Sequence, residues 1–294
     1  MRVAHLILTY TNPAQTERMI KAMWHEDFDY YIHVDKKFDI TPHLILQNIP
    51  NVYFIEKRTD VRWSGFSTII AEFESIKEIV STGRNYSFIN LLSGQGYPVR
   101  PPQEIANFYR DNVGKEFLEF KDFIHEWPEG LLRMDGYFIS DYNFPGRFRL
   151  EQAMTMILPK KRIPYNLHPY GKSMFWMLSP EAALYVVNKV ENDPKLKRFF
   201  SLSWASDEFV FPTILMNSEY KDKVVNNNYR YIDWSAGGAN PKVLLTEDFE
   251  PIMESNKLFA RKFTADASGV LMDKIDAVIN PTGKSIPEIS AVKL

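Results

Sequence analysis

The sequence predicts an α/β fold in which helices cover a largely parallel sheet. Near-continuous apolar runs such as Val3–Thr9 and Tyr86–Leu92 are typical of strands buried on both faces of a parallel sheet. Helical patterns separate the first strands, and this βαβαβ order favours right-handed crossovers and a doubly wound sheet. No internal repeat or low-complexity linker interrupts the 294 residues, so we expect a single domain.

The amino-terminal elements follow one another with clear boundaries. Asn12 followed by Pro13 is a helix-starting signal, and the helix should run to about Trp24. A stronger helix follows the turn Trp63–Ser67, with Ser67 as its expected cap. Its core stripe comprises Ile69, Phe73, Ile76 and Val80, with Glu72 and Glu78 off the stripe. The strands expected in this half are Val3–Thr9, Tyr30–Val34, Val52–Ile55 and Tyr86–Leu92.

The carboxy-terminal half is less regular. A helix over Pro101–Arg110 precedes a strand at Glu116–Phe120, and Ser179-Pro180 opens a helix over Ala182–Val190. Residues 121–170 have no clear period, and we expect a long active-site excursion there. Further strand patterns occupy Lys172–Leu178 and Tyr229–Trp234, and a Gly237-Gly238 loop and the segment Lys257–Phe263 follow.

Composition excludes several classes of protein. A net charge of −2 gives no basic field for nucleic acid, and the absence of cysteine removes disulfides and thiolate sites. Neither a GxGxxG nor a GxxxxGK[ST] motif occurs, so a classical dinucleotide fold or P-loop is not expected. No apolar run is long enough for a signal peptide or a membrane span. We expect a cytoplasmic protein, with a peripheral membrane contact still compatible.

Two turns can bring backbone close to a ligand. The Trp63-Ser64-Gly65 turn offers backbone N–H groups at a helix start. The turn Ser93-Gly94-Gln95-Gly96 follows a central strand, where its glycines admit close approach, although a plain tight turn explains them equally well. Asp35 also follows a strand, where it either accepts from a nucleoside or caps the next turn.

The segment Trp204–Phe211 contains the strongest catalytic candidate. Asp207 and Glu208 are adjacent acids in an apolar run, and low-dielectric surroundings raise a carboxyl pKa toward the range of a general base. The competing interpretation is structural, because Ser206 or Asp207 could cap a helix over Phe209–Met216.

A metal site has little support in the sequence. The six histidines show no HExxH motif or paired ligand spacing. The turn Ser93–Gly96 contains no acid, and Asp27-Phe28-Asp29 falls at the wrong end of a strand, where we expect solvated surface. Without a metal, a reaction that expels an anionic leaving group would need fixed cations, such as Arg or Lys, to stabilise the developing negative charge.

Taken together, these motifs resemble the core-2/I-branching β-1,6-N-acetylglucosaminyltransferases and their xylosyltransferase relatives. The resemblance spans roughly residues 3–264 in order and spacing. It is carried by YIHVD at 31–35, VRWSGFS at 61–67, INLLSGQGYP at 89–98, residues 171–178, WASDEF at 204–209, residues 229–234 and LFARKF at 258–263. The resemblance implies a GT-A fold (a Rossmann-like mixed sheet flanked by helices) over 1–264, with 265–294 as an extension.

The resemblance also assigns roles to individual residues. Glu208 falls on the catalytic base, Arg230 and Lys262 on donor-diphosphate cations, and Asp35 on the nucleoside acid. Glu119 lies loosely near an acceptor-binding acid, while Gly96 replaces an aspartate usual in relatives. The remaining pocket residues expected for donor or acceptor are Trp63, Ser93, Gly94, Gln95, Trp204 and Asp207.

The predicted function is therefore an inverting glycosyltransferase that needs no metal or other cofactor. The resemblance implies a UDP-sugar donor, foremost UDP-N-acetylglucosamine with UDP-xylose or UDP-glucose as alternatives, and a glycan or polysaccharide acceptor. A catalytically silent sugar-binding module on the same scaffold is the rival class. A glycoside hydrolase would require two opposed carboxylates, and the sequence nominates only Glu208.

Overall fold

The computed structural model describes residues 1–238 and 240–281. The chain forms two compact units, each built from separate stretches of sequence. The first unit combines Met1–Glu56, Asn85–Val113 and the described part of Tyr229–Leu294. The second unit combines Lys57–Arg84 and Gly114–Asn228. The prediction of a single domain over residues 1–264 stays a prediction.

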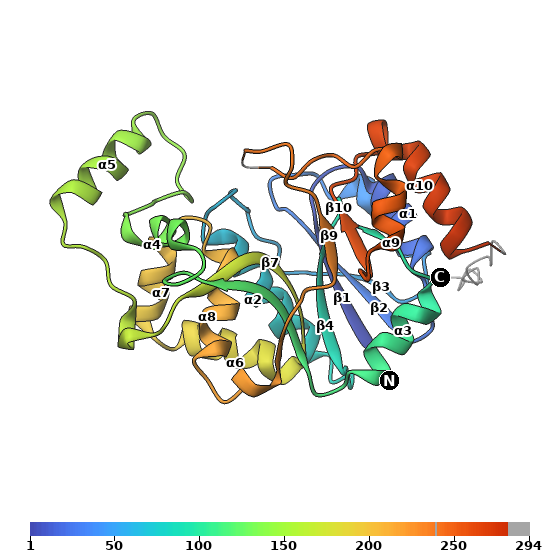
Figure 1. Cartoon of the computed structure of the whole chain (residues 1–294), viewed down its shortest axis with the longest axis horizontal. Helices are drawn as coiled ribbons and strands as arrows, with labels where there is room; N and C mark the ends of the chain where they lie inside the picture. The colour runs from blue at the N-terminus through green and yellow to red at the C-terminus, as the bar shows by residue number, and fades with distance from the viewer. Residues whose placement is uncertain (239, 282–294) are drawn as a thin grey trace. The chain divides into compact units, whose positions relative to one another are not determined.

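A parallel sheet forms the core of the first unit (Figure 1). Its strand order is β3-β2-β1-β4, and β1 (Val3–Thr9) pairs in parallel with both β2 (Phe28–Val34) and β4 (Phe88–Ser93). All residues of β2 are buried, as expected for a strand covered on both faces. The remaining elements of this part are α1 (Pro13–Ala22), the 3₁₀ helix η1 (Thr41–Asn48), β3 (Val52–Phe54) and α3 (Pro102–Asp111).

A small second sheet completes the first unit. Its order is β5-β10-β9, so β10 (Phe259–Arg261) pairs antiparallel with β5 (Tyr97–Pro98) and parallel with β9 (Arg230–Ile232). The 3₁₀ helix η6 (Thr246–Asp248), α9 (Phe249–Glu254) and α10 (Ala265–Ile279) accompany this sheet.

An ionic clasp fastens α10 to α1. The Arg18 guanidinium of α1 donates to Asp273 at 2.6 Å and to Asp276 at 2.7 Å. The hydroxyl of Tyr97 donates to Asp276 at 2.6 Å. Four apolar or sulfur side chains of α10 are buried behind the clasp: Leu271, Met272, Ile275 and Ile279. The first fifteen residues of the predicted extension are thus packed onto the first unit.

The second unit is built on a mixed sheet. Within it β6 (Glu116–Asp122) runs antiparallel to β7 (Tyr170–Leu178) and parallel to β8 (Val224–Asn226). The buried rings of Phe73, Trp176 and Phe211 meet at centroid separations of 4.9–6.0 Å. The helices of this unit are α2 (Ser67–Ser81), α6 (Pro180–Glu191), α7 (Pro194–Ser201), η4 (Ser206–Glu208), α8 (Val210–Met216) and η5 (Lys221–Lys223).

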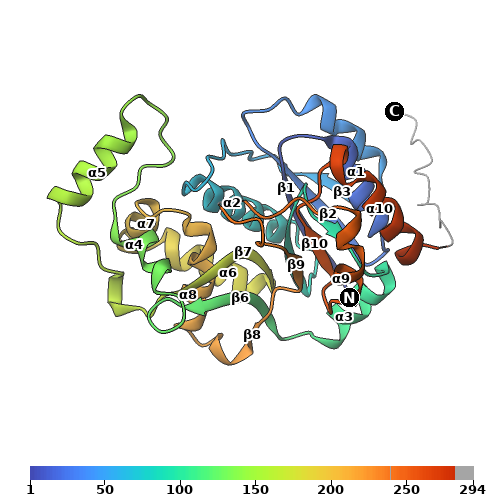
Figure 2. The ribbon, with the colours of Figure 1, turned by 45° about the horizontal axis from the view of Figure 1, so that its top comes forward.

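Residues 121–170, whose sequence has no clear period, form an excursion of short helices in the second unit. It contains η2 (Pro128–Leu131), α4 (Leu132–Asp135), α5 (Arg147–Ile157) and η3 (Pro164–Asn166). Both ribbon views show α5 standing clear of α6 and α8 of the same unit (Figures 1 and 2). In the part of the chain that the structure describes, no helix is both long and apolar enough to cross a membrane.

Two acidic side chains are fully buried, and for Asp29 the expected solvated surface is wrong. Glu72 does not face solvent: it is fully buried and accepts from Trp176 Nε1 at 3.2 Å, because a large indole fills the face beside the core stripe. Asp29 is likewise fully buried within β2, where it accepts from the hydroxyl of Tyr86 at 2.6 Å and pairs with Arg2. Neither acid belongs to a solvated surface.

Candidate active site

An ion pair between Glu208 and Arg133 marks the candidate site of the second unit. Nη2 and Nε of Arg133 donate to Oε2 of Glu208 at 2.6 and 3.0 Å. The Arg133 guanidinium lies 4.7 Å from the ring centroid of Trp127 and 4.8 Å from that of Trp204. Both side chains are mostly buried, at 17% and 25% exposure. Since both bonds fall on Oε2, the arrangement fixes the carboxylate while leaving Oε1 outside the ion pair.

The adjacent acids have raised pKa values for physical reasons that differ in detail. Burial raises the pKa of Glu208, and the charge and hydrogen bonds of Arg133 offset part of that rise. Burial and the charge of Glu208 together raise the pKa of Asp207 to about 7. The Oδ1 atom of Asp207 is buried without a hydrogen-bond partner among the described residues. This environment is suited to proton transfer near neutral pH.

The alternative interpretation of these acids as helix caps is not supported. Helix α8 begins at Val210 without a side-chain cap, and the hydroxyl of Ser206 has no partner among the residues described. Ala205 holds φ at 49°, in the left-handed region, and its N–H donates to the carbonyl of Ser64 at 2.9 Å. Non-glycine residues persist there only when their surroundings impose it.

A third acid lies behind the pair. Burial and the charge of Asp207 raise the pKa of Glu72 well above its usual range, although Trp176 donates to it. Glu72 Oε1 has no hydrogen-bond partner within the described residues. The raised pKa favours the neutral form of Glu72, which places less negative charge beside Asp207 and Glu208 than a carboxylate would.

The turn Trp63-Ser64-Gly65 contributes an aromatic wall. The rings of Trp63 and Trp204 meet edge to face at 5.8 Å, and Trp63 is 66% exposed. The expected free N–H groups at this turn were wrong: Asp141 accepts from the backbone of Phe66 and Ser67 at 3.0 Å. Ser67 is therefore not the cap of α2, because the carboxylate of Asp141 accepts from the N–H groups at the start of this helix.

The turn Ser93–Gly96 in the first unit is tightly packed against protein. A Cβ at Gly94 would lie 2.5 Å from Thr9 Oγ1, so close packing accounts for this glycine. Gln15 donates to the carbonyls of Gly94 and Phe263 at 3.1 Å, and Gln95 accepts from the N–H of Phe263 at 3.0 Å. The hydroxyl of Ser93 is buried without a partner among the described residues, and it is the polar group of this turn that a ligand could satisfy.

Asp35 lies at the same sheet edge as Ser93. It follows β2, Ser93 ends β4, and β1 lies between these strands, so their backbones are about 10 Å apart. Asp35 is 7% exposed, accepts from the N–H of Lys37 at 3.0 Å, and forms an ion pair with its ammonium at 2.9 Å. The contacts with Lys37 match the interpretation of Asp35 as a turn cap. Asp35 also lies at the carboxyl ends of the parallel strands, where open α/β sheets bind ligands.

The two predicted diphosphate cations differ in environment. Arg230 is 4% exposed and donates to Asn90 Oδ1 at 2.5 Å and to the carbonyl of Leu91 at 2.6 Å. Lys262 follows β10 and is half-buried, and its ammonium forms no ion pair with any described residue. The register pairs Arg230 with Phe259, and Lys262 follows the end of β10, three residues beyond Phe259.

Glu119 is not grouped with Glu208. It forms an ion pair with Lys172, the residue after Gly171 in β7. A Cβ on Gly171 would lie 2.4 Å from that of Phe209 and 2.8 Å from the carbonyl of Glu208. Because successive strand residues face opposite sides of a sheet, the pair Glu119–Lys172 lies on the face away from Phe209.

The comparisons with known proteins agree with the sequence resemblance. The model of the Core-2/I-Branching enzyme family matches residues 3–252. The chain belongs to this family. The predicted resemblance is thereby confirmed. The structure confirms the predicted α/β fold class, with strands and helices in both units.

The individual curated relatives have low sequence identity to this chain. The chain is 26% identical over 301 residues to xylosyltransferase 1 of Rattus norvegicus, covering 95% of this chain and 35% of the relative. It is 25% identical over 300 residues to xylosyltransferase 2 of Homo sapiens, covering 94% and 33%. The chain thus spans about a third of the length of these curated relatives.

Two solved structures are also similar. Mouse xyloside xylosyltransferase 1 in its apo form gives a TM-score of 0.41 at 10% identity, covering 90% of this chain and 99% of that chain. The glycosyltransferase GlyE of Streptococcus pneumoniae TIGR4 gives a TM-score of 0.38 at 11% identity, covering 95% and 63%.

Proposed function

We propose that this protein is an inverting glycosyltransferase that moves a sugar from a UDP-sugar to a glycan hydroxyl. The supporting observation is Glu208, whose carboxylate is largely buried, raised in pKa and held at one oxygen by Arg133. In the proposed reaction Glu208 removes the proton of the acceptor hydroxyl as its oxygen attacks the anomeric carbon. The bond to UDP breaks on the opposite face, which inverts the anomeric configuration.

The wall of Trp63 and Trp204 supports a sugar partner. An exposed indole presents an apolar face to the C–H groups of a sugar ring, and the 66% exposure of Trp63 makes that face accessible. We therefore assign the acceptor to this part of the second unit, beside Glu208.

The nucleotide is assigned to the first unit. The proposed contacts are Asp35 for the nucleoside, Ser93 for a polar group of the UDP-sugar and Lys262 for the diphosphate. Lys262 is chosen because a cation without an ion pair can bind phosphate oxygens. Arg230 is proposed as a second diphosphate cation, acting from a buried position. Transfer without a metal is part of the proposal, as is a donor chosen among UDP-xylose, UDP-N-acetylglucosamine and UDP-glucose. The names of the relatives favour testing UDP-xylose first.

The decisive test is Glu208→Gln. The wild type should release UDP from one of the three donors when a glycan acceptor mixture is present. Loss of the general base should reduce kcat about 10²–10⁴-fold while UDP affinity by calorimetry is unchanged. Glu181→Gln, an exposed acid on α6, is the matched control. Near-normal turnover in Glu208→Gln would refute the mechanism, and donor binding without turnover in the wild type would identify a sugar-binding module instead.

A further inference from the structure

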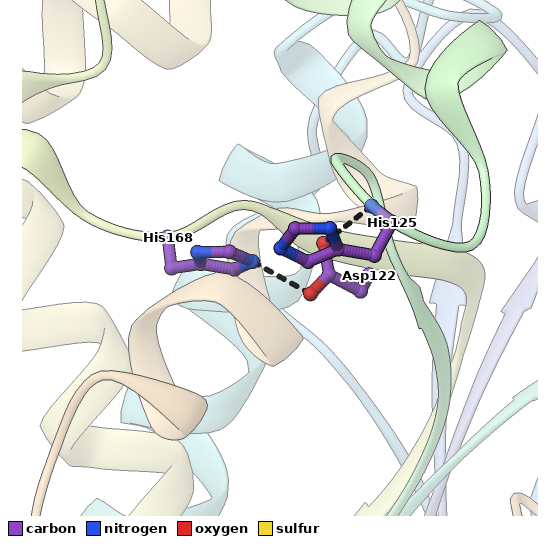
Figure 3. Close-up of side chains that lie close together, drawn as sticks. All are labelled: Asp122, His125 and His168. Atoms are coloured by element: carbon purple, nitrogen blue, oxygen red, sulfur yellow. Dashed lines mark hydrogen bonds and ion pairs between the residues drawn. The ribbon is translucent and has the colours of Figure 1, made fainter.

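Three side chains that can ligate a metal lie together in the second unit, and none of the proposed catalytic roles uses them. Asp122 ends β6, His125 follows in the next turn, and His168 precedes β7 (Figure 3). One ligand atom from each side chain lies within 4.8 Å of the other two. The sequence hides this grouping because His168 is separated from the other two by more than forty residues.

The backbone presets two of the three ligands. Asp122 Oδ1 accepts from the N–H groups of Ile124 at 2.7 Å and His125 at 3.2 Å, which leaves Oδ2 directed at His168 Nε2, 2.7 Å away. The backbone of His168 is held on both sides by the side chain of Asn217, at 3.0 and 2.8 Å. His125 is exposed, so its ring can turn at little cost.

We propose that Asp122, His125 and His168 bind one divalent transition metal per chain, with Zn²⁺ as the best match. Two imidazoles and one carboxylate are a recurrent zinc donor set, with water in the fourth position. With metal–ligand bonds of about 2.0–2.2 Å, tetrahedral ligand atoms are about 3.3 Å apart. The contact between Asp122 and His168 must open slightly, and the exposed His125 must close. Backbone N–H donors to Asp122 and the bonds of Asn217 to the main chain of His168 would hold these two ligands in place.

A metal here would stiffen the turn that carries one wall of the Arg133 site. The carbonyl of Asp122 accepts from the N–H groups of Glu126 at 2.9 Å and Trp127 at 2.8 Å. The ring of Trp127 in turn lies against Arg133. The metal is therefore a structural support and takes no part in the proposed transfer.

Calorimetric titration of chelator-stripped protein with ZnCl₂ tests the site directly. We expect one Zn²⁺ per chain, with affinity reduced at least tenfold in Asp122→Asn and in His125→Ala. Asn retains the acceptor for the two backbone N–H groups, and His125 is exposed, so both variants should fold. His25→Gln, in the first unit, is the histidine control. No stoichiometric binding, or equal binding by all variants, would overturn the proposal. Either result is independent of turnover, which tests the proposed function separately.

A second inference rests on the surface of α5. This helix buries only Glu151, and its large apolar side chains are open to solvent: Phe148 is 69%, Met156 84% and Ile157 79% exposed. Tyr142, Phe144, Leu150 and Leu158 are more than two-fifths exposed as well. Soluble proteins rarely leave such a group of apolar side chains uncovered without an interaction partner.

The charge of the same stretch is uniformly positive toward solvent. Residues 142–168 contain five lysines and arginines and a single acid, Glu151. That acid is 7% exposed, accepts from the N–H of Ile139 at 2.9 Å and pairs with Arg147. Arg149, Lys160 and Arg162 remain exposed beside the apolar residues.

We infer that α5 and its flanking residues bind the surface of an anionic membrane. Exposed aromatic and aliphatic side chains interspersed with Lys and Arg can enter the headgroup region of an acidic membrane, where the cations hold acidic headgroups. A protein partner or a second copy of the chain would require a complementary acidic surface instead, whereas anionic lipid satisfies both features at once.

Vesicle sedimentation distinguishes these occupants. The full chain should sediment with vesicles containing about one-third phosphatidylglycerol and far less with neutral phosphatidylcholine, with binding weakened by salt. The double variant Phe148→Ser/Ile157→Ser should lose binding at least tenfold, whereas Val270→Ser, an exposed apolar residue on α10, should not. Equal sedimentation of variant and wild type would overturn the inference. So would self-association by light scattering that the double variant abolishes without any vesicle binding.

Discussion

Replacing Arg133 by Met should shift the pH dependence of turnover. The wild-type guanidinium stabilises the charged form of Glu208 through two hydrogen bonds at 2.6 and 3.0 Å. Methionine retains an unbranched side chain between Trp127 and Trp204 but removes the charge and both donors. Burial, which already raises the pKa of Glu208, would then act without opposition.

The size of the shift follows from the burial of the pair. At 17% and 25% exposure, solvent screens the interaction little, so a charged hydrogen bond stabilises the carboxylate by about 1.5–3 kcal/mol. Loss of that stabilisation should raise the pKa of Glu208, since nothing then offsets its burial. A general base must be deprotonated, so the acid limb of the kcat profile should move to higher pH, and turnover on that limb should fall about 10- to 100-fold.

The free energy of unfolding of Arg133→Met should fall as pH rises, whereas its turnover should increase with pH along the acid limb. A carboxyl whose folded pKa exceeds its unfolded value binds more protons in the folded state, so its contribution to stability falls as pH rises through that window. The destabilisation of Arg133→Met should therefore be larger at pH 8 than at pH 5, as urea unfolding would show.

Initial rates of UDP release across pH 5–9 give the profile. Arg133→Lys should show a smaller shift, and Arg110→Met, which removes an exposed arginine of α3, should show none. An unchanged acid limb in Arg133→Met would mean that Glu208 is not the titrating base, however active the variant remains.

Three further outcomes are expected. Lys262→Ala should weaken UDP binding about 10- to 150-fold by calorimetry, as the loss of a charge-assisted phosphate contact implies, whereas Lys274→Ala should leave it unchanged. Turnover of the wild type should survive EDTA. His168→Ala should behave in the same way, which would separate catalysis from the proposed zinc site. If EDTA abolished turnover in both proteins and Mn²⁺ restored it, metal-free transfer would be contradicted. Burial lowers the pKa of Lys161 to about 7, so the unfolded chain binds more protons above that pH and wild-type stability should rise between about pH 7 and 10. In Lys161→Met the urea midpoint should lack this rise, and an equal rise would show that another group titrates.

Local sequence patterns were sufficient for most regular elements. The predicted strand Val3–Thr9 has the same bounds as β1, and Ser179 accepts from the N–H of Ala182 at the start of α6. Such elements depend on apolar periodicity and on caps within a few residues, both of which are visible in a single sequence. The acids Asp207 and Glu208 were also readable, because two charges inside an apolar run stand out.

The environment of those acids was not readable. Arg133 lies 75 residues before Glu208, in a stretch without period, and its contact with Trp204 depends on tertiary packing. Asp141 reaches the start of α2 across a similar separation. A partial signal existed for Glu72, since an acid one position before the core stripe residue Phe73 can be buried if a large side chain such as Trp176 covers it.

The position of β10 determines where this protein can be divided. The family match ends at residue 252, yet β10 lies between β5 and β9 and is the only strand that joins them in the described sheet. Beyond it, Arg18 holds α10 through two aspartates. A fragment cut at the family boundary would separate β5 from β9 and expose the apolar face beneath α10. Chimeras that exchange the two units between relatives should therefore carry the segment through residue 279 together with the amino-terminal sheet.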